Sequence, residues 1–260
     1  MNRIDQLFKE KKNNILNIYC TAGFPHLEST IKVIEALEKN GADIIEIGIP
    51  YSDPLADGPV IQKSNMQALQ NGMNLNLLFS QLQQIKASIT VPIILMGYFN
   101  SVLQYGIEKF CAAAEDAGVS GIILPDLPLY EYEKLYKKIF QKHGLHFIFL
   151  VTPETSEKRM KEADKLSGGF IYAVSSSSTT GNTIVKNNNE EYFKKLKLLK
   201  FSKPVLVGFG ISDKESFDKA CVYTNGAIIG SAYINAIKKA KNIDLVTKNF
   251  IKLIKDGPDL

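Results

Sequence analysis

The sequence has no tryptophan and only three cysteines and three histidines among its 260 residues. Cys20, Cys111 and Cys221 are far apart and form no Cys-x-x-Cys pair, which argues against the common zinc and dithiol motifs. The histidines show no spacing typical of metal ligands. We therefore expect reduced thiols and no metal site.

Long apolar runs are also missing. No stretch approaches the roughly 20 apolar residues that cross a membrane, and the N-terminal segment MNRIDQLFKEKKNN lacks the apolar core and cleavage site of a signal peptide. The net charge of +4 comes from 31 basic and 27 acidic residues spread along the chain, so the lysines most simply form a solvated outer surface. These features predict a cytoplasmic protein that binds neither a membrane nor nucleic acid.

Short apolar segments alternate with amphipathic segments from end to end, as in successive βα units around a parallel sheet. The expected strands cover residues 15–20, 43–49, 92–98, 121–125, 147–151, 170–174, 204–208 and 227–229. The expected helices cover residues 4–11, 29–40, 60–70, 75–86, 107–117, 130–142, 156–166, 190–199, 213–223 and 245–255.

This alternation predicts an α/β fold, a (β/α)8 TIM barrel with an extra N-terminal helix. Eight βα units in 260 residues fit the size of a closed barrel, whereas an open doubly wound sheet, the alternative, usually has fewer strands. No linker interrupts the pattern, so we expect a single domain over residues 1–260. In such a barrel the loops after the strands meet on one face, where the active site is expected.

Two carboxylates flank a loop of turn-forming residues in the segment EIGIPYSDPLADGP, residues 46–59. Glu46 interrupts an apolar run whose β-branched residues predict a strand buried on both faces. Burial among isoleucines should raise the pKa of Glu46 toward neutrality, so that it can donate and accept protons near pH 7. Asp57 lies in the loop, where prolines and Gly58 can hold the backbone in place.

Glycine-rich turns follow the seventh and eighth expected strands, at Gly208-Phe209-Gly210 and at Gly230-Ser231. Glycine allows close approach of the backbone, and free N–H groups at such turns bind anions. Either turn alone could simply connect a strand to a helix, but the two together at these strands favour a phosphate site. No G-x-G-x-x-G opens a helix after the first strand, which disfavours a dinucleotide.

A polar loop, SSSSTTGN at residues 175–182, follows the sixth expected strand. Its small hydroxyl residues suit a lid that closes over a ligand and excludes water. Closure could bring Thr180 toward the carboxylates and the backbone of Gly181 toward a phosphate. An ordinary surface loop is the alternative.

Four motifs together resemble the tryptophan synthase alpha chain family: the segment 46–59, TAGFP at 21–25, GFGIS at 208–212 and IGSA at 229–232. The resemblance extends over nearly the whole chain. It implies a lyase that cleaves indole-3-glycerol phosphate into indole and glyceraldehyde 3-phosphate by a retro-aldol step. It also implies that indole passes to a beta chain in an α2β2 heterotetramer, with pyridoxal phosphate only in that beta chain and no cofactor in this one.

The resemblance implies a role for each site residue. Glu46 is expected to protonate C3 of indole and to assist removal of the glycerol hydroxyl proton, and Asp57 to accept a hydrogen bond from indole N1–H. The residues expected to bind the substrate are Tyr19, Met96, Tyr98, Ile123, Tyr172 and Thr180. Those expected to bind the phosphate are Gly181, Phe209, Gly210, Gly230 and Ser231. For the apolar and aromatic members, packing inside the barrel is the alternative.

Asp53, Pro54 and Asn100 are similar to family positions on the face that meets the beta chain. Asp126, in the turn after the fourth strand, resembles a position near the active site, although capping of a turn is as good an interpretation. The lid and Phe24 depart from the usual family pattern, whereas Glu46 and Asp57 do not.

Three other functions are compatible with parts of this pattern. A stand-alone indole-3-glycerol-phosphate lyase would share every catalytic residue and release free indole. A non-catalytic barrel would have no need of Glu46 and Asp57. A sugar-phosphate isomerase would share the phosphate turns but gives no reason for the two carboxylates.

Overall fold

The strands of this computed structural model form one parallel sheet, described over residues 1–54, 57–175, 184–208 and 210–258. Its order is β5-β4-β3-β2-β1-β9-β8-β7-β6, and every pairing is parallel. The strands are β1 (Ile15–Thr21), β2 (Ile44–Gly48), β3 (Ile93–Met96), β4 (Gly121–Ile123), β5 (His146–Phe147), β6 (Leu150–Val151), β7 (Ile171–Val174), β8 (Val205–Gly208) and β9 (Gly226–Ile229).

The sheet closes on itself through the segment that joins β5 to β6. These two strands are at opposite ends of the sheet order but only two residues apart in the chain. Between them, Ile148 N–H donates to the Ile122 carbonyl at 3.0 Å on one side, and the Phe149 carbonyl accepts from Tyr172 N–H at 3.1 Å on the other. The strand expected over residues 147–151 is thus present as two short segments, and the predicted eight-stranded barrel is confirmed.

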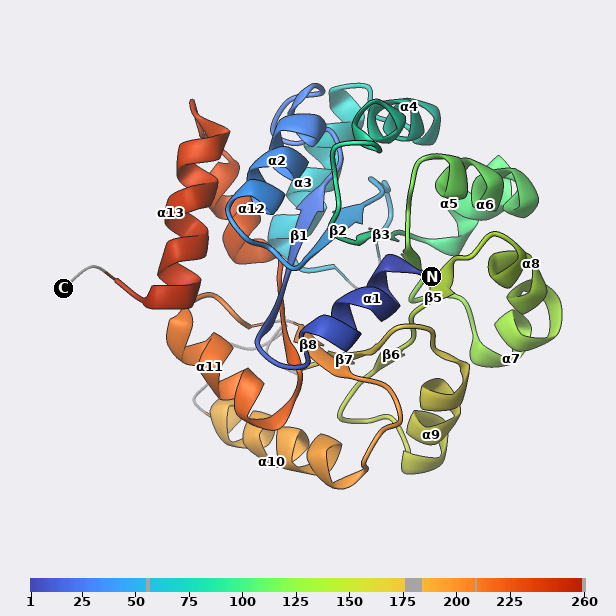
Figure 1. Cartoon of the computed structure of the whole chain (residues 1–260), viewed down its shortest axis with the longest axis vertical. Coiled ribbons are helices and arrows are strands. Elements are labelled where there is room, and N and C mark those ends of the chain that lie inside the picture. The colour runs from blue at the N-terminus through green and yellow to red at the C-terminus, as the bar shows by residue number, and fades with distance from the viewer. Residues whose placement is uncertain (55–56, 176–183, 209, 259–260) are drawn as a thin grey trace.

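Helices surround the sheet, as the ribbon shows (Figure 1). They are α1 (Arg3–Glu10), α2 (Ser29–Lys39), α3 (Pro59–Gln70), α4 (Leu75–Ile85), α5 (Phe99–Tyr105), α6 (Ile107–Asp116), α7 (Leu129–Glu131), the π-helix η1 (Tyr132–Tyr136), α8 (Lys137–Lys142), α9 (Glu157–Leu166), α10 (Ile184–Leu198), α11 (Lys214–Tyr223), α12 (Ser231–Ile237) and α13 (Ile243–Asp256). No helix in the described part of the chain is long and apolar enough to cross a membrane.

Two differences from the expected helices have identifiable physical causes. The helix expected over 130–142 is divided into α7, η1 and α8, because η1 inserts a wider turn. The short helix α5 was not expected, and its first N–H, at Phe99, is bonded by the Asp126 carboxylate at 2.9 Å. Asp126 therefore caps the start of α5 and not the turn in which it lies, so its role is structural but differs from the expected capping of a turn.

The apolar residues form two layers. The larger layer lies between the sheet and the helices, and the smaller one fills the barrel, where alternate residues of each strand point inward. Ile4 of α1 belongs to the inner layer together with Ile15, Ile44 and Ile148, so α1 closes the end of the barrel where the strands begin. The opposite end, where the strands finish, is left for the site.

Candidate active site

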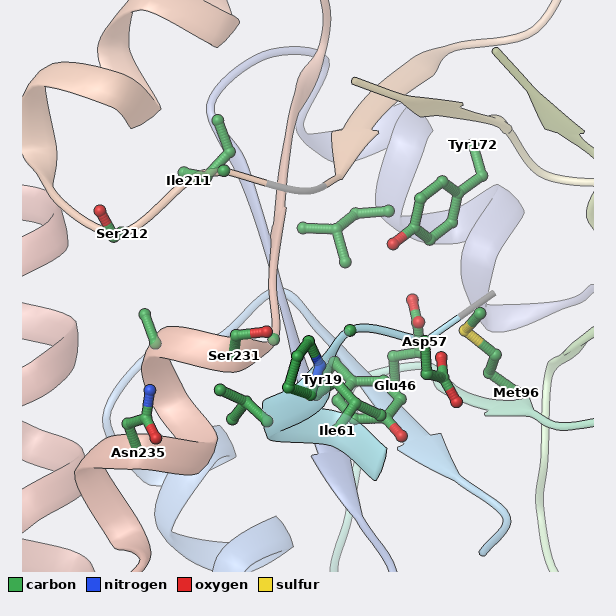
Figure 2. A pocket seen from close by; sticks show the side chains of 17 residues that line it. Tyr19, Glu46, Asp57, Ile61, Met96, Tyr172, Ile211, Ser212, Ser231 and Asn235 are labelled. Atoms are coloured by element: carbon green, nitrogen blue, oxygen red, sulfur yellow. The ribbon is translucent and has the colours of Figure 1, made fainter. Parts of the chain in front are cut away.

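A cavity of about 430 Å³ opens where the strands end (Figure 2). Its walls come from β1, β2, β3, β7 and β9, from the loop before α3, and from the first turns of α3 and α12. The lining residues are Tyr19, Glu46, Asp57, Gly58, Pro59, Val60, Ile61, Met96, Tyr172, Gly210, Ile211, Ser212, Ile228, Gly230, Ser231, Ala232 and Asn235.

Glu46 is fully buried on the inward face of β2, next to Tyr19 across the β1–β2 pairing. Its Oε2 accepts a hydrogen bond of 2.8 Å from Asn17 Nδ2, and its Oε1 has no partner among the described residues. Burial raises the pKa of Glu46 to about 8; the Asn17 hydrogen bond opposes this rise and the Asp57 charge adds to it. The predicted upward shift is therefore present, and its main cause is the predicted one.

Asp57 is placed just before α3, where Gly58 is the N-cap and Pro59 the first helical residue. Proline suits this position because its fixed φ matches the helix and no N–H is needed there. The Asp57 carboxylate accepts hydrogen bonds from Asn65, at 3.3 Å, and from Tyr98. Burial raises the pKa of Asp57 to about 6, and these two hydrogen bonds oppose the rise. The two carboxyls of the cavity thus titrate on opposite sides of pH 7.

Tyr19 and Tyr172 reach into the cavity from β1 and β7 (Figure 2). Each phenol lies over a glycine: a Cβ on Gly48 would be 2.0 Å from the Tyr19 hydroxyl, and a Cβ on Gly208 would be 2.4 Å from the Tyr172 hydroxyl. Burial raises the pKa of both phenols well above the usual value, so both are neutral at pH 7. Only glycine leaves room for these rings.

The other end of the cavity is formed by glycine turns and by the start of α12. Gly230 is the N-cap of α12, Ser231 is its first residue, and Asn235 lies one turn further on. Gly210 has a φ of 73°, which favours glycine, and is followed by Ser212 along the wall. Figure 2 shows Ser212, Ser231 and Asn235 on one side and the two carboxylates on the other.

The structure brings most of the predicted site residues together. Tyr19, Met96 and Tyr172 line the cavity with both carboxylates, whereas Tyr98 acts on Asp57 from outside the lining. Ile123 is buried inside the barrel and is not among the lining residues. The predicted residues Thr180, Gly181 and Phe209 lie outside the described part of the chain.

The residues expected to meet a partner follow two neighbouring strands: Asp53 and Pro54 lie in the loop after β2, and Asn100 lies in α5, after β3. Asp53 and Asn100 are exposed, and Pro54 is half-buried. Asp53 accepts a hydrogen bond from Ser52, and the Asn100 amide donates to the Tyr51 hydroxyl at 3.4 Å. These residues are accessible to a partner chain.

Sequence reasoning did not identify the asparagines around the carboxylates. Asn17 and Asn65 are buried and donate to Glu46 and Asp57, and Asn235 lines the far wall. A signal for Asn17 existed, since it is the one polar residue between Ile15 and Cys20 apart from the phenol of Tyr19. Among the described residues, no group of three or more His, Cys, Asp or Glu side chains is placed to hold a metal ion.

A (β/α)8 barrel whose cavity, at the carboxyl ends of the strands, holds two carboxyls of raised pKa is typical of an enzyme. The sequence matches the tryptophan synthase alpha chain family over residues 5–256. The chain therefore belongs to that family, and it is a lyase.

Individual relatives agree with this assignment. The chain is 51% identical over 235 residues to the tryptophan synthase alpha chain of Flavobacterium psychrophilum, covering 90% of this chain and 92% of that one. Over 255 residues it is 51% identical to that of Karelsulcia muelleri, covering 97% and 100%. The solved alpha subunit from Legionella pneumophila superposes with a TM-score of 0.89 at 34% identity, covering 99% and 98%. The tryptophan synthase complex from Pyrococcus furiosus gives 0.84 at 32% identity, covering 94% and 98%.

Proposed function

We propose that the chain cleaves indole-3-glycerol phosphate into indole and glyceraldehyde 3-phosphate, with Glu46 as the proton donor and acceptor and Asp57 as the anchor of the indole ring. The observation that carries this proposal is the pair of carboxyls in one cavity, with pKa values of about 8 and about 6. At pH 7 Glu46 is mostly protonated and Asp57 mostly ionised, so the two have different roles.

The reaction needs one proton to be donated and one to be removed. Glu46 gives its proton to C3 of indole, while the Asp57 carboxylate accepts a hydrogen bond from N1–H and stabilises the positive charge that develops on the ring. The bond between C3 and the glycerol chain then breaks, and its electron pair returns to the ring. Glu46, now a carboxylate, takes the glycerol hydroxyl proton as the aldehyde forms, which restores its starting state.

The far end of the cavity suits the phosphate of the substrate. The first N–H groups of a helix have no partner within the helix and carry partial positive charge, and α12 begins at Ser231 on the cavity wall. The glycines at 210 and 230 let the backbone approach an anion closely. A phosphate bound there would direct the indole ring toward Glu46 and Asp57.

The proposal extends to a partner. The family name implies a beta chain, and the likeness to the Pyrococcus furiosus complex supports assembly with one. We assign Asp53, Pro54 and Asn100 to the face that meets it, in an α2β2 assembly in the cytoplasm. Pyridoxal phosphate would belong to the beta chain, and this chain would need no cofactor.

The direct test is indole release from indole-3-glycerol phosphate by the purified chain, alone and with a tryptophan synthase beta chain. We expect slow release by the chain alone and a marked increase when the beta chain is added. Absence of indole in both assays would refute the proposal. Full activity of the isolated chain, unchanged by the beta chain, would instead identify a stand-alone lyase.

A further inference from the structure

Asn17 is a fully buried amide on the inward face of the barrel wall. It lies on the inward face of β1, two residues before Tyr19, and its Nδ2 donates to Glu46 Oε2 at 2.8 Å. Asn17 is not among the residues that line the cavity. It therefore touches the acid–base residue from behind, on the side away from the substrate.

This contact makes the two oxygens of Glu46 inequivalent. Oε2 faces an N–H donor, and an oxygen that accepts from that N–H is a poor site for the acidic proton, because the two hydrogens would compete for the same contact. Oε1 has no partner among the described residues, and Glu46 lines the cavity. The proton is therefore directed to Oε1, the oxygen that no described residue contacts.

We propose that Asn17 is a positioning residue for the lyase reaction, which holds Glu46 by Oε2, keeps the transferable proton on Oε1 and favours the carboxylate that must form after protonation of the ring. This inference rests on the proposed function of Glu46. An N–H that donates to a carboxylate stabilises the charged form, so the amide keeps the proton affinity of Glu46 from rising further.

The other titratable groups near Glu46 do not supply this effect. Asp57, from the loop before α3, raises the proton affinity of Glu46 because its charge is of the same sign. Tyr19, Cys20 and Tyr172, from β1 and β7, are neutral at pH 7, because burial raises the pKa of each. Among the described residues, Asn17 is the donor to this carboxyl.

The test compares the pH dependence of kcat/KM in the parent chain with that in Asn17→Leu and Asn17→Asp, two side chains of nearly the same shape. Glu46 must begin protonated, so its ionisation causes the alkaline loss of activity. Asn17→Leu removes the donor and should move this alkaline limb upward by about half to one pH unit, the equivalent of one net hydrogen bond. Asn17→Asp adds a second carboxyl and should move it further.

Ile15→Val is the matched control, because Ile15 is the previous inward residue of β1 and packs in the apolar layer. It should lower stability slightly and leave the alkaline limb in place. An unchanged limb in both Asn17 variants would overturn the inference, even if kcat fell, because a purely structural role would lower rate without moving the limb.

A second measurement does not depend on turnover. The infrared carbonyl band of protonated Glu46, assigned by its loss in Glu46→Gln, can be followed as the pH rises. We expect the band to persist to higher pH in Asn17→Leu and Asn17→Asp than in the parent. If the parent releases no indole but the band shifts in the Asn17 variants, the proposed function fails while the control of Glu46 by Asn17 stands. If the parent releases indole and the band does not shift in the Asn17 variants, the proposed function stands and the control of Glu46 by Asn17 fails.

Discussion

The two ends of the barrel use the same strands for different purposes. At the closed end, Ile15 and Ile44 pack against Ile4 of α1 in a fully buried apolar layer. Two residues further along the same strands, Asn17 and Glu46 replace isoleucine with a hydrogen-bonded polar pair. Two inward-facing positions that are neighbours on the same strand thus differ: we expect the first to contribute to stability and propose that the second contributes to chemistry.

The largest expected effect is at the open end. Glu46→Gln keeps the shape of the side chain but removes the transferable proton, so kcat for indole release should fall by roughly 10³-fold or more. Steady-state kinetics with the beta chain present measure this loss. Glu162→Gln, an exposed change on α9, should leave the rate unaltered. A Glu46→Gln chain that retained turnover would show that the proton comes from elsewhere.

Asp57→Asn should have the next largest effect on rate. The amide cannot stabilise positive charge on the indole ring, and we expect kcat/KM to fall by roughly 10²-fold. The acid limb of the pH profile, expected near the Asp57 pKa of about 6, should disappear in the variant. Asp116→Asn, exposed at the end of α6, serves as the control. Retention of the acid limb would assign it to a different group.

At the closed end the expected loss is in stability rather than in rate. Ile4→Ala leaves a cavity in the apolar layer at the closed end of the barrel, so the free energy of unfolding should fall by about 3 kcal/mol. We expect kcat to stay near that of the parent. Val222→Ala, at a mostly exposed position of α11, should cost far less. Urea denaturation and indole assays on the same samples would compare the two. A large fall in kcat for folded Ile4→Ala would show that the closed end of the barrel contributes to turnover as well as to stability.

The pH dependence of stability gives a graded effect. Both carboxyls have a higher pKa in the folded chain than their ordinary values of 4.5 and 3.8. Between those values and about pH 8 the folded state binds more protons than the unfolded state, so the free energy of unfolding should fall as the pH rises. Glu46→Gln should remove most of this slope, whereas Glu162→Gln should keep it. Urea midpoints at pH 5 and pH 8.5 provide the measurement.

The sequence predicted the barrel, and it singled out the two carboxylates that the structure places in one cavity, because both features depend on local patterns. Alternating apolar segments define strands and helices, and Glu46 stands out in an apolar run. The contact between Asn17 and Glu46 depends instead on the register of β1 against β2, which pairs Asn17 with Ile44 and Tyr19 with Glu46. No spacing along the chain contains that information.

The short helices were missed for a similar reason. The start of α5 is fixed by Asp126, a carboxylate 27 residues away, and α5 itself has only seven residues. A helix this short has little periodicity of its own, so a tertiary contact decides whether it forms. The same limit applies to Ile123, whose apolar character suits a ligand wall and a packed interior equally, and which the structure places in the interior.

Gly48 and Gly208 lie behind the cavity, yet they set its width. Because each leaves space for a phenol hydroxyl, one added methyl group at either position would displace Tyr19 or Tyr172, both of which line the cavity. The width of the cavity therefore depends partly on two residues that are not among its lining residues. A substitution at either glycine would change the shape of the cavity without replacing any residue that lines it.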